Sequence, residues 1–164
     1  ELNRARLAGD ALPGAQFDAD AELPALLATL SMIHGQHLAI TFDSPPNLHL
    51  PWDREDMLEL LGTLLDNACK WADARVELRL RQTEVGYDIQ VQDDGPGIPE
   101  GERDQVVSRG TRLDEQTAGH GLGLGIVRDI VDAWGASMQL TTGEWGGLLV
   151  TIELVHPANG ATTA

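Results

Sequence analysis

The stretch Gly119-His120-Gly121-Leu122-Gly123-Leu124-Gly125 places glycine at alternate positions and leads straight into an apolar-patterned segment that ends at Gly135. This spacing predicts a helix over residues 122–134 that is entered through a glycine-rich loop. Because the first N–H groups of a helix lack partners within it, such a loop can hold phosphate oxygens. The spacing is not that of a dinucleotide fingerprint, and the Gly-Lys-Ser/Thr of a P-loop is absent. Taken alone, the stretch could also be the hinge of a lid.

A second stretch, Asp93-Asp94-Gly95-Pro96-Gly97-Ile98, follows a β-prone run. The end of a strand would fix the Asp93 carboxylate, while Gly95 and Gly97 would let another group approach the backbone. A fixed carboxylate there can accept a hydrogen bond from an exocyclic amine, such as the one adenine carries at N6. An Asp-Gly pair is also an ordinary turn signal.

A third stretch, Asp66-Asn67-Ala68-Cys69-Lys70, lies on a helix for which Asp53 is a credible N-cap. Apolar residues of this helix keep one face, while its polar residues, Glu59, Thr63, Asn67 and Lys70, share another. An amide oxygen from Asn67 could ligate Mg²⁺ while the Lys70 ammonium meets a phosphate. Polar residues of these types are also common on a solvated face.

The remaining periodicity predicts an α+β fold in which helices cover one face of a mixed sheet. One more helix is expected over residues 23–33, stopped by Gly35, and Gly86 is placed in the turn of a hairpin. The predicted strands span residues 38–42, 75–82, 87–92, 138–142 and 148–154. A short helix and a mobile loop are expected over residues 99–118, where Arg109 and Arg112 could add positive charge over a terminal phosphate or simply be solvated.

Composition narrows the possible partners. Of 164 residues, 11 are basic and 26 acidic, which gives a net charge of −15. Nucleic-acid binding needs clustered Lys and Arg, so DNA, RNA and anionic lipid surfaces are poor partners for this chain. No apolar run reaches membrane-spanning length and no leader is visible, so we expect a soluble globular domain that is a piece of a larger protein. The single cysteine, Cys69, is expected to be a buried thiol in a reducing compartment.

Together the three stretches resemble, in order and in spacing, the ATP-binding domain of sensor histidine kinases and of the wider gyrase, Hsp90, histidine-kinase and MutL (GHKL) superfamily. Residues 64–71 resemble the N box of this family, residues 93–99 its G1 box and residues 119–127 its G2 box. The resemblance covers residues 17–155 and extends most closely to the PhoQ-type sensor kinases. It implies a two-layer α/β sandwich of the GHKL (Bergerat) type.

The resemblance also implies ATP and Mg²⁺ as cofactors and assigns roles by position. Asn67 would hold Mg²⁺, Lys70 would contact phosphate and Asp93 would take the adenine amine, in a pocket shaped by Gly95 and Gly97. Arg109 and Arg112 would be lid contacts. His120 could touch the terminal phosphate or be an exposed loop residue. The phosphates would be wrapped by Gly119, His120, Gly121, Leu122 and Gly123.

Three departures from the family pattern bear on the reaction. Thr63 stands where the hydrolytic branch of the superfamily has a water-activating Glu, and residues 106–110 replace the Phe-rich box of the family. None of the 5 histidines has the sequence context of the phospho-accepting histidine. The sequence therefore predicts a histidine protein kinase fragment that donates the γ-phosphoryl of ATP to a histidine on an absent dimerisation domain. A non-catalytic nucleotide-binding regulatory module and a GHKL-type ATPase are the alternatives.

The expected domain boundaries follow from the same resemblance. Residues 1–12 would be the remnant of a dimerisation-domain helix with its linker, residues 13–157 the catalytic domain and residues 158–164 a flexible tail. The implied partners are the dimerisation domain of the same protein, a response regulator and a second copy in a homodimer. The implied location is cytoplasmic, as part of an inner-membrane sensor.

Overall fold

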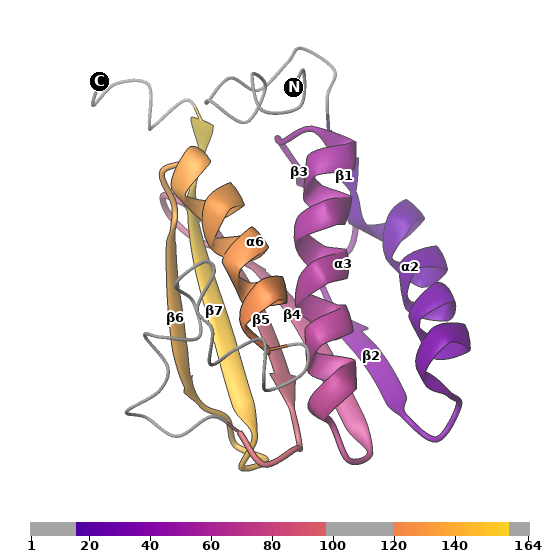
Figure 1. Ribbon diagram of the computed structural model, residues 1–164. Helices are drawn as coiled ribbons and strands as arrows, with labels where there is room; N and C mark the ends of the chain where they lie inside the picture. Colours follow the sequence, from indigo (N-terminus) through magenta and orange to yellow (C-terminus); the bar gives the residue numbers. More distant parts are fainter. Residues whose placement is uncertain (1–15, 98–119, 158–164) are drawn as a thin grey trace.

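The computed structural model describes residues 16–97 and 120–157, and for residues 120–123 it describes the backbone alone. Within these ranges, helices α2 (Ala19–His34), α3 (Arg54–Trp71) and α6 (His120–Ala133) lie on one face of a five-stranded sheet (Figure 1). β2 is parallel to β4 and the other neighbours are antiparallel, so the sheet is mixed. In spatial order its strands are β2 (Ala39–Asp43), β4 (Arg75–Gln82), β5 (Gly86–Asp93), β7 (Leu148–Val155) and β6 (Ser137–Thr142).

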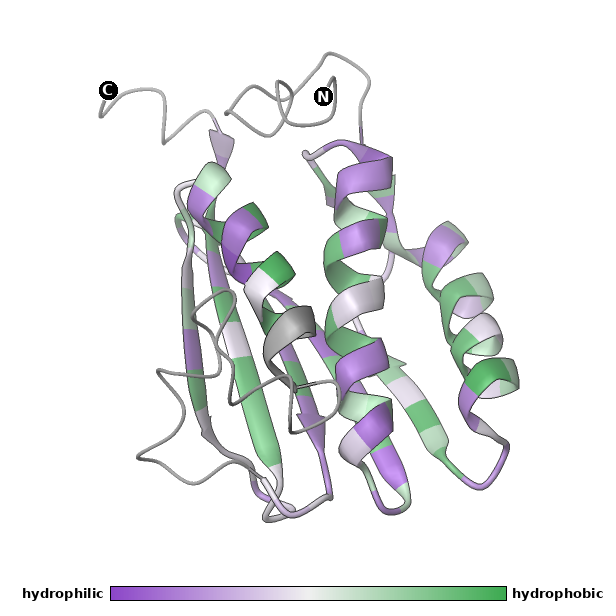
Figure 2. Ribbon diagram, viewed as in Figure 1, coloured by the Kyte–Doolittle hydropathy of each residue, from purple (hydrophilic) through white to green (hydrophobic). Residues whose placement is uncertain are grey.

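The core lies between the helices and the inner face of the sheet. Along β4 the buried residues Val76, Leu78 and Leu80 alternate with the more exposed Glu77 and Arg79, which is the pattern of a strand with one covered face. Figure 2 shows the same alternation of hydrophobic and hydrophilic residues along the strands. Helix α3 packs in the middle of the helical layer and buries Leu60, Leu61, Leu64 and Leu65. The predicted α+β, two-layer fold is confirmed.

The sequence prediction was incomplete in two details. Gly86 closes the predicted hairpin turn, because the backbone N–H of Thr83 donates to its oxygen at 2.8 Å and its own N–H donates to Oγ1 of Thr83 at 3.0 Å. Gly86 is also the first residue of β5, where a Cβ would lie 1.8 Å from the backbone oxygen of Leu154, so the close approach of β7 is what requires glycine. The prediction also missed a small antiparallel sheet of β1 (Phe17–Asp18) and β3 (His49–Leu50), whose strands are too short to show a period.

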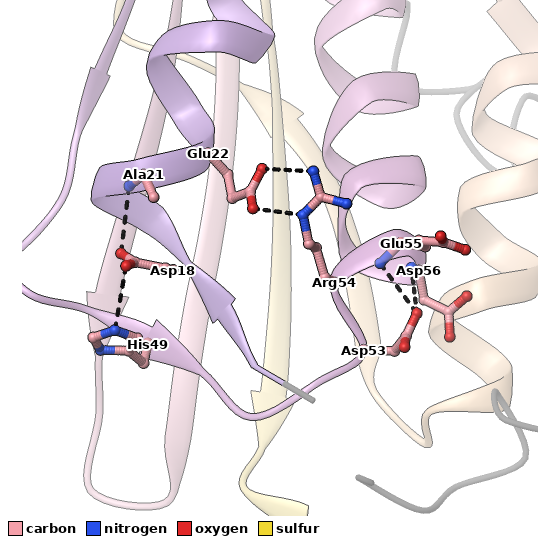
Figure 3. Close-up of polar contacts among 8 residues, drawn as sticks. All are labelled: Asp18, Ala21, Glu22, His49, Asp53, Arg54, Glu55 and Asp56. Atoms are coloured by element: carbon pink, nitrogen blue, oxygen red, sulfur yellow. Dashed lines mark hydrogen bonds and ion pairs between the residues drawn. The ribbon is translucent and has the colours of Figure 1, made fainter. Parts of the chain in front are cut away.

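Side-chain hydrogen bonds lie at the starts of α2 and α3 (Figure 3). Asp53 caps α3 as predicted, because its Oδ2 accepts hydrogen bonds from the backbone N–H groups of Glu55 and Asp56, each at 3.1 Å. Arg54 then reaches across to Glu22 on α2, donating from Nε at 2.5 Å and from Nη2 at 3.1 Å. This two-bond pair joins the N-terminal halves of the two helices.

An aromatic cluster closes one end of the layer. The ring of Trp52, just before α3, lies edge-on to Tyr87 of β5 at 5.7 Å and stacks on Trp134 after α6 at 5.6 Å. These contacts join α3, β5 and α6 at the end of the helical layer where α3 begins. The aromatic cluster does not occupy the opposite end, where α3 ends. No helix in the described ranges is both long and apolar enough to cross a membrane.

Gly62 in the middle of α3 gives a first prediction. A Cβ built there lies 3.8 Å from Cδ1 of Leu26, which is ordinary contact. Gly62→Ala should therefore raise the free energy of unfolding by about 0.5–1 kcal/mol, since alanine loses less backbone entropy in a helix. Urea denaturation measures this change. A loss of stability would show that α2 and α3 pack more tightly than the structure has them.

Candidate nucleotide site

Three segments meet at the end of the sheet opposite the aromatic cluster: the last turn of α3, the end of β5 and the β6–β7 hairpin (Figure 1). A Cβ on Gly95, just after β5, would lie 2.0 Å from the backbone oxygen of Trp71 at the end of α3. A Cβ on Gly147 in the hairpin would lie 2.2 Å from the backbone oxygen of Asp93. The backbones are thus in direct contact, and glycine at both positions allows this approach.

Asp93 holds a buried carboxylate at this junction. Its side chain is only 3% exposed, and its Oδ1 accepts a hydrogen bond from the backbone N–H of Gly95 at 2.8 Å. Burial raises the pKa of Asp93, although bonds from the backbone N–H groups of Gly95 and Leu148 partly oppose that rise. The carboxylate lies where the sequence predicted it, and it can accept a hydrogen bond from a ligand.

The neighbouring Asp94 has a different task, which the sequence did not reveal. Its Oδ1 accepts hydrogen bonds from the backbone N–H groups of Asp73, Ala74 and Arg75 at 2.9, 3.0 and 3.2 Å. Partial burial alone would raise the pKa of Asp94, but the bonds from Ala74, Arg75 and Asp73 lower it. Asp94 therefore ties the turn after β5 to the start of β4, and so keeps Asp93 beside α3.

Asn67 is buried, whereas the sequence placed it on the polar face of α3 together with Lys70. Its side chain is 4% exposed, and its Oδ1 has no hydrogen-bond partner among the described residues. Leaving a buried polar atom unpaired costs about 1–3 kcal/mol. An amide oxygen is a ligand type that Mg²⁺ accepts, so the orphaned oxygen fits a metal ion or a water bound to one.

The other metal-ligating residue types do not form a competing site. In the parts of the chain that the structure describes, no three His, Cys, Asp or Glu side chains form a group that could hold a metal. A cation beside Asn67 would therefore take most of its ligands from phosphates and water, as Mg²⁺ commonly does in nucleotide sites.

Cys69, between Asn67 and Lys70, is the buried thiol that the sequence predicted. Burial, together with the charges of Asp66 and Asp93, raises its pKa to about 12. The thiol is therefore protonated at neutral pH and is a poor nucleophile. Its contribution to the site is packing.

Lys70 is the exposed member of this turn. Its Nζ lies 3.4 Å from Oδ2 of Asp66 one turn earlier, and its side chain is 46% exposed. The other oxygen of Asp66 lies 2.7 Å from Nε2 of His34, the last residue of α2. The Lys70 ammonium is therefore accessible to a ligand while it is paired with the Asp66 carboxylate.

The structure describes only some of the other residues that the sequence predicted for the site. Gly97 lies against the β6–β7 hairpin with φ +78°, a value that favours glycine. Helix α6 begins at His120, so His120, Gly121, Leu122 and Gly123 form its first turn, and the predicted start at Leu122 was two residues late. Arg109, Arg112 and Gly119 lie outside the described residues. Phosphate binding by this segment stays a prediction.

The β6–β7 hairpin is the part of the site that sequence reasoning missed. The predicted strands over residues 138–142 and 148–154 left residues 143–147 only as the connection between them, yet Gly147 packs on Asp93, and the Arg75 guanidinium lies 3.9 Å from the ring centroid of Trp145. This cation–π contact holds the hairpin against the start of β4. Its only visible signal in the sequence was the density of glycine in Gly143-Glu144-Trp145-Gly146-Gly147.

Comparison with known families agrees with this geometry. Residues 52–158, more than half of the chain, match the family described as histidine kinase-, DNA gyrase B- and HSP90-like ATPases. The chain belongs to this family. As a member of it, the chain is an ATP-binding domain of the type found in sensor histidine kinases, with the α+β fold of the GHKL superfamily.

The individual relatives that match are named as sensor kinases. Sensor protein kinase CarS of Pseudomonas aeruginosa is 58% identical over 160 residues, which are 98% of this chain and 36% of CarS. Virulence sensor histidine kinase PhoQ of Salmonella typhimurium is 34% identical over 74% of this chain and 25% of its own length. The chain thus spans about a third or less of these relatives.

A solved structure shows the same fold. The mycobacterial sensor histidine kinase MprB superposes with a TM-score of 0.72 at 26% identity, over 85% of this chain and 95% of the MprB chain. The shared fold includes the layer of helices on one face of a mixed sheet, which positions the candidate site.

Proposed function

We propose that this chain is the catalytic domain of a two-component sensor histidine kinase, which binds ATP with Mg²⁺ and donates the γ-phosphoryl to a histidine on the dimerisation domain. The observation that carries the proposal is the buried Oδ1 of Asn67, which has no partner in the described part of the chain and lies at the same end of the sheet as the buried carboxylate of Asp93. Burying an amide oxygen and a carboxylate where three segments meet costs folding free energy. A ligand that bonds to both groups would offset this cost.

Each residue has a distinct part in the proposed site. Asp93 accepts a hydrogen bond from the adenine amine, which selects adenine over a base with a carbonyl at that position. Asn67 ligates Mg²⁺, and Lys70 places its ammonium on the phosphates. When bound, Mg²⁺ neutralises charge on the phosphates. Further phosphate contacts are assigned to Arg109, Arg112, Gly119, His120, Gly121, Leu122 and Gly123.

Thr63 favours phosphoryl transfer over hydrolysis. It lies on α3 one turn before Asn67 and is partly buried, at the position where a general base would stand in a hydrolytic relative. A threonine hydroxyl does not remove a proton from water at neutral pH, so hydrolysis by that route lacks its base. The ATPase alternative is therefore the weaker one.

The proposal includes a larger protein in which this domain is one part. Residues 1–12 are assigned to the dimerisation helix and its linker, residues 13–157 to the catalytic domain and residues 158–164 to a tail. A second copy and a response regulator are the partners proposed. A cytoplasmic position, in a sensor anchored in the inner membrane, is part of the same proposal.

Asn67→Ala tests the metal role. Calorimetry with a non-hydrolysable ATP analogue should show tighter binding with Mg²⁺ than without it, and the variant should lose about tenfold or more of the Mg²⁺-dependent gain. Its apo stability should fall little, because the Oδ1 that has no partner among the described residues is removed with the side chain. Gln36→Ala, an exposed amide after α2, is the control and should bind as the wild type does. Equal Mg²⁺ dependence in wild type and Asn67→Ala would contradict the assignment.

Phosphoryl transfer is tested with a separate chain that carries the dimerisation domain. Incubation with γ-labelled ATP and Mg²⁺ should label a histidine of that chain and no histidine of this one. Steady release of phosphate without labelling would favour the ATPase, and tight binding without either reaction would favour a regulatory module.

A further inference from the structure

A line of three polar side chains runs from α2 to the exposed ammonium of the site. Nε2 of His34, the last residue of α2, lies 2.7 Å from Oδ1 of Asp66 on α3. The other oxygen of Asp66, Oδ2, lies 3.4 Å from Nζ of Lys70, one turn further along α3. One carboxylate is thus shared between two helices and two nitrogen atoms.

The short contact has a definite direction. A carboxylate oxygen accepts hydrogen bonds, so this contact is made by the ring tautomer of His34 in which Nε2 carries the hydrogen and donates it. The His34 side chain is 14% exposed, against 38% for Asp66, so the donor end of the bond is the better shielded. A bond of this length to a charged acceptor fixes the orientation of the carboxylate.

The position of His34 is itself well fixed. Gly35 ends α2 with φ +106°, and its backbone N–H donates to the oxygen of Ser31 at 2.9 Å. At the other end of α2, Glu22 binds Arg54 of α3 through two hydrogen bonds. The N-terminal end of α2 is therefore tied to α3 independently of His34, and His34 reaches Asp66 from a capped helix end.

We infer that His34 is a positioning residue for the phosphate-binding lysine: by holding Oδ1 of Asp66, it presents Oδ2 to Lys70 and keeps the ammonium at the site. This inference rests on the proposed contact between Lys70 and phosphate. A lysine side chain has four rotatable bonds, and the freedom it loses on binding weakens affinity.

A single contact of 3.4 Å to Asp66 restrains the Lys70 chain before the nucleotide arrives. That contact also leaves most of the ammonium donors for phosphate oxygens. Without His34, the Asp66 carboxylate rotates freely and no longer holds the Lys70 ammonium at the site.

The test compares the affinities for ADP and adenosine in the presence of Mg²⁺, since only ADP presents phosphates to Lys70. His34→Ala should weaken ADP binding by about five- to tenfold and leave adenosine binding unchanged. Asp66→Asn keeps an acceptor for His34 and removes the charge that holds Lys70, so it should show the same selective loss. His34→Gln, whose amide can donate to the carboxylate, should restore most of the ADP affinity.

Two further variants separate the inference from the proposed function. Lys70→Met should lose the ADP preference by itself, and adding His34→Ala to it should cause no further loss. If Lys70→Met binds ADP normally, the phosphate role of Lys70 is wrong. If Lys70→Met loses ADP binding and His34→Ala does not, the positioning role is wrong. An equal loss of ADP and adenosine binding in His34→Ala would show a structural role only. His37→Ala, an exposed histidine nearby, is the matched control and should bind both ligands normally.

Discussion

Asp93→Asn is expected to lower the affinity for ATP by about 100-fold and, at the same time, to make the apo domain more stable. The loss of affinity follows from the proposed contact, because one carboxylate oxygen becomes an amide N–H that faces the adenine amine, donor against donor. Asn can keep the hydrogen bond that Oδ1 accepts from the backbone N–H of Gly95. Calorimetry with ATP and urea denaturation without it measure the two effects.

The gain in stability follows from the raised pKa of Asp93, whose main cause is burial. A carboxyl whose pKa is higher in the folded than in the unfolded state destabilises the fold when it is charged. The penalty is present above the folded-state pKa and disappears as the pH falls to the unfolded value near 3.9. Asp93→Asn should therefore add about 1 kcal/mol at pH 7, and this gain should shrink as the pH is lowered.

Asp94→Asn is the matched control. Asp94 is one residue away, and its replacement should change the stability in the opposite direction. Its pKa is lowered by the backbone N–H groups that it binds, so its charge stabilises the fold above the unfolded pKa. The variant should lose about 1 kcal/mol at pH 7, and the loss should fade in acid. If both variants destabilise the domain equally, the carboxylate of Asp93 supports the fold and is not held at a cost for a ligand.

Local rules accounted for the main elements because these elements depend on neighbours in sequence. The cap at Asp53, the stop at Gly35 and the alternation along β4 each follow from a few adjacent residues, and all were confirmed. The order of helices and strands then left few ways to form layers with one core, so the two-layer fold could be predicted as well.

Long-range contacts decided what could not be predicted. Periodicity places Asn67 and Lys70 on neighbouring parts of α3, but only the packing of other segments over Asn67 makes one buried and the other exposed. The bond between His34 and Asp66 joins residues 32 positions apart, and no local pattern shows it. The need for glycine at position 86 was missed for the same reason, because the strand that crowds it comes much later in the chain.

Gly147→Ala is expected to have the second large effect on the site. A Cβ at this position would lie 2.2 Å from the backbone oxygen of Asp93 and 2.5 Å from its Oδ1. Contacts this short force the β6–β7 hairpin or the end of β5 to move, which should cost about 1–3 kcal/mol in the free energy of unfolding. Because the displaced group is the proposed adenine acceptor, ATP affinity should fall by about tenfold or more. Urea denaturation and calorimetry measure the two losses.

Gly62→Ala supplies the comparison, since the same change on α3 adds a methyl group where 3.8 Å of space is available. Gly62→Ala should leave ATP affinity unchanged while raising stability. A fall in ATP affinity with Gly147→Ala would then be due to the position of Gly147 and not to the change from glycine to alanine. The contact with Arg75 through Trp145 resists movement of the hairpin, so the strain should be transmitted to Asp93 and not absorbed by the turn. Full ATP affinity in a destabilised Gly147→Ala would place the strain in the hairpin and remove Gly147 from the site. Combining Gly147→Ala with Asp93→Asn should give less than the sum of the two losses in affinity, because both changes act on one acceptor.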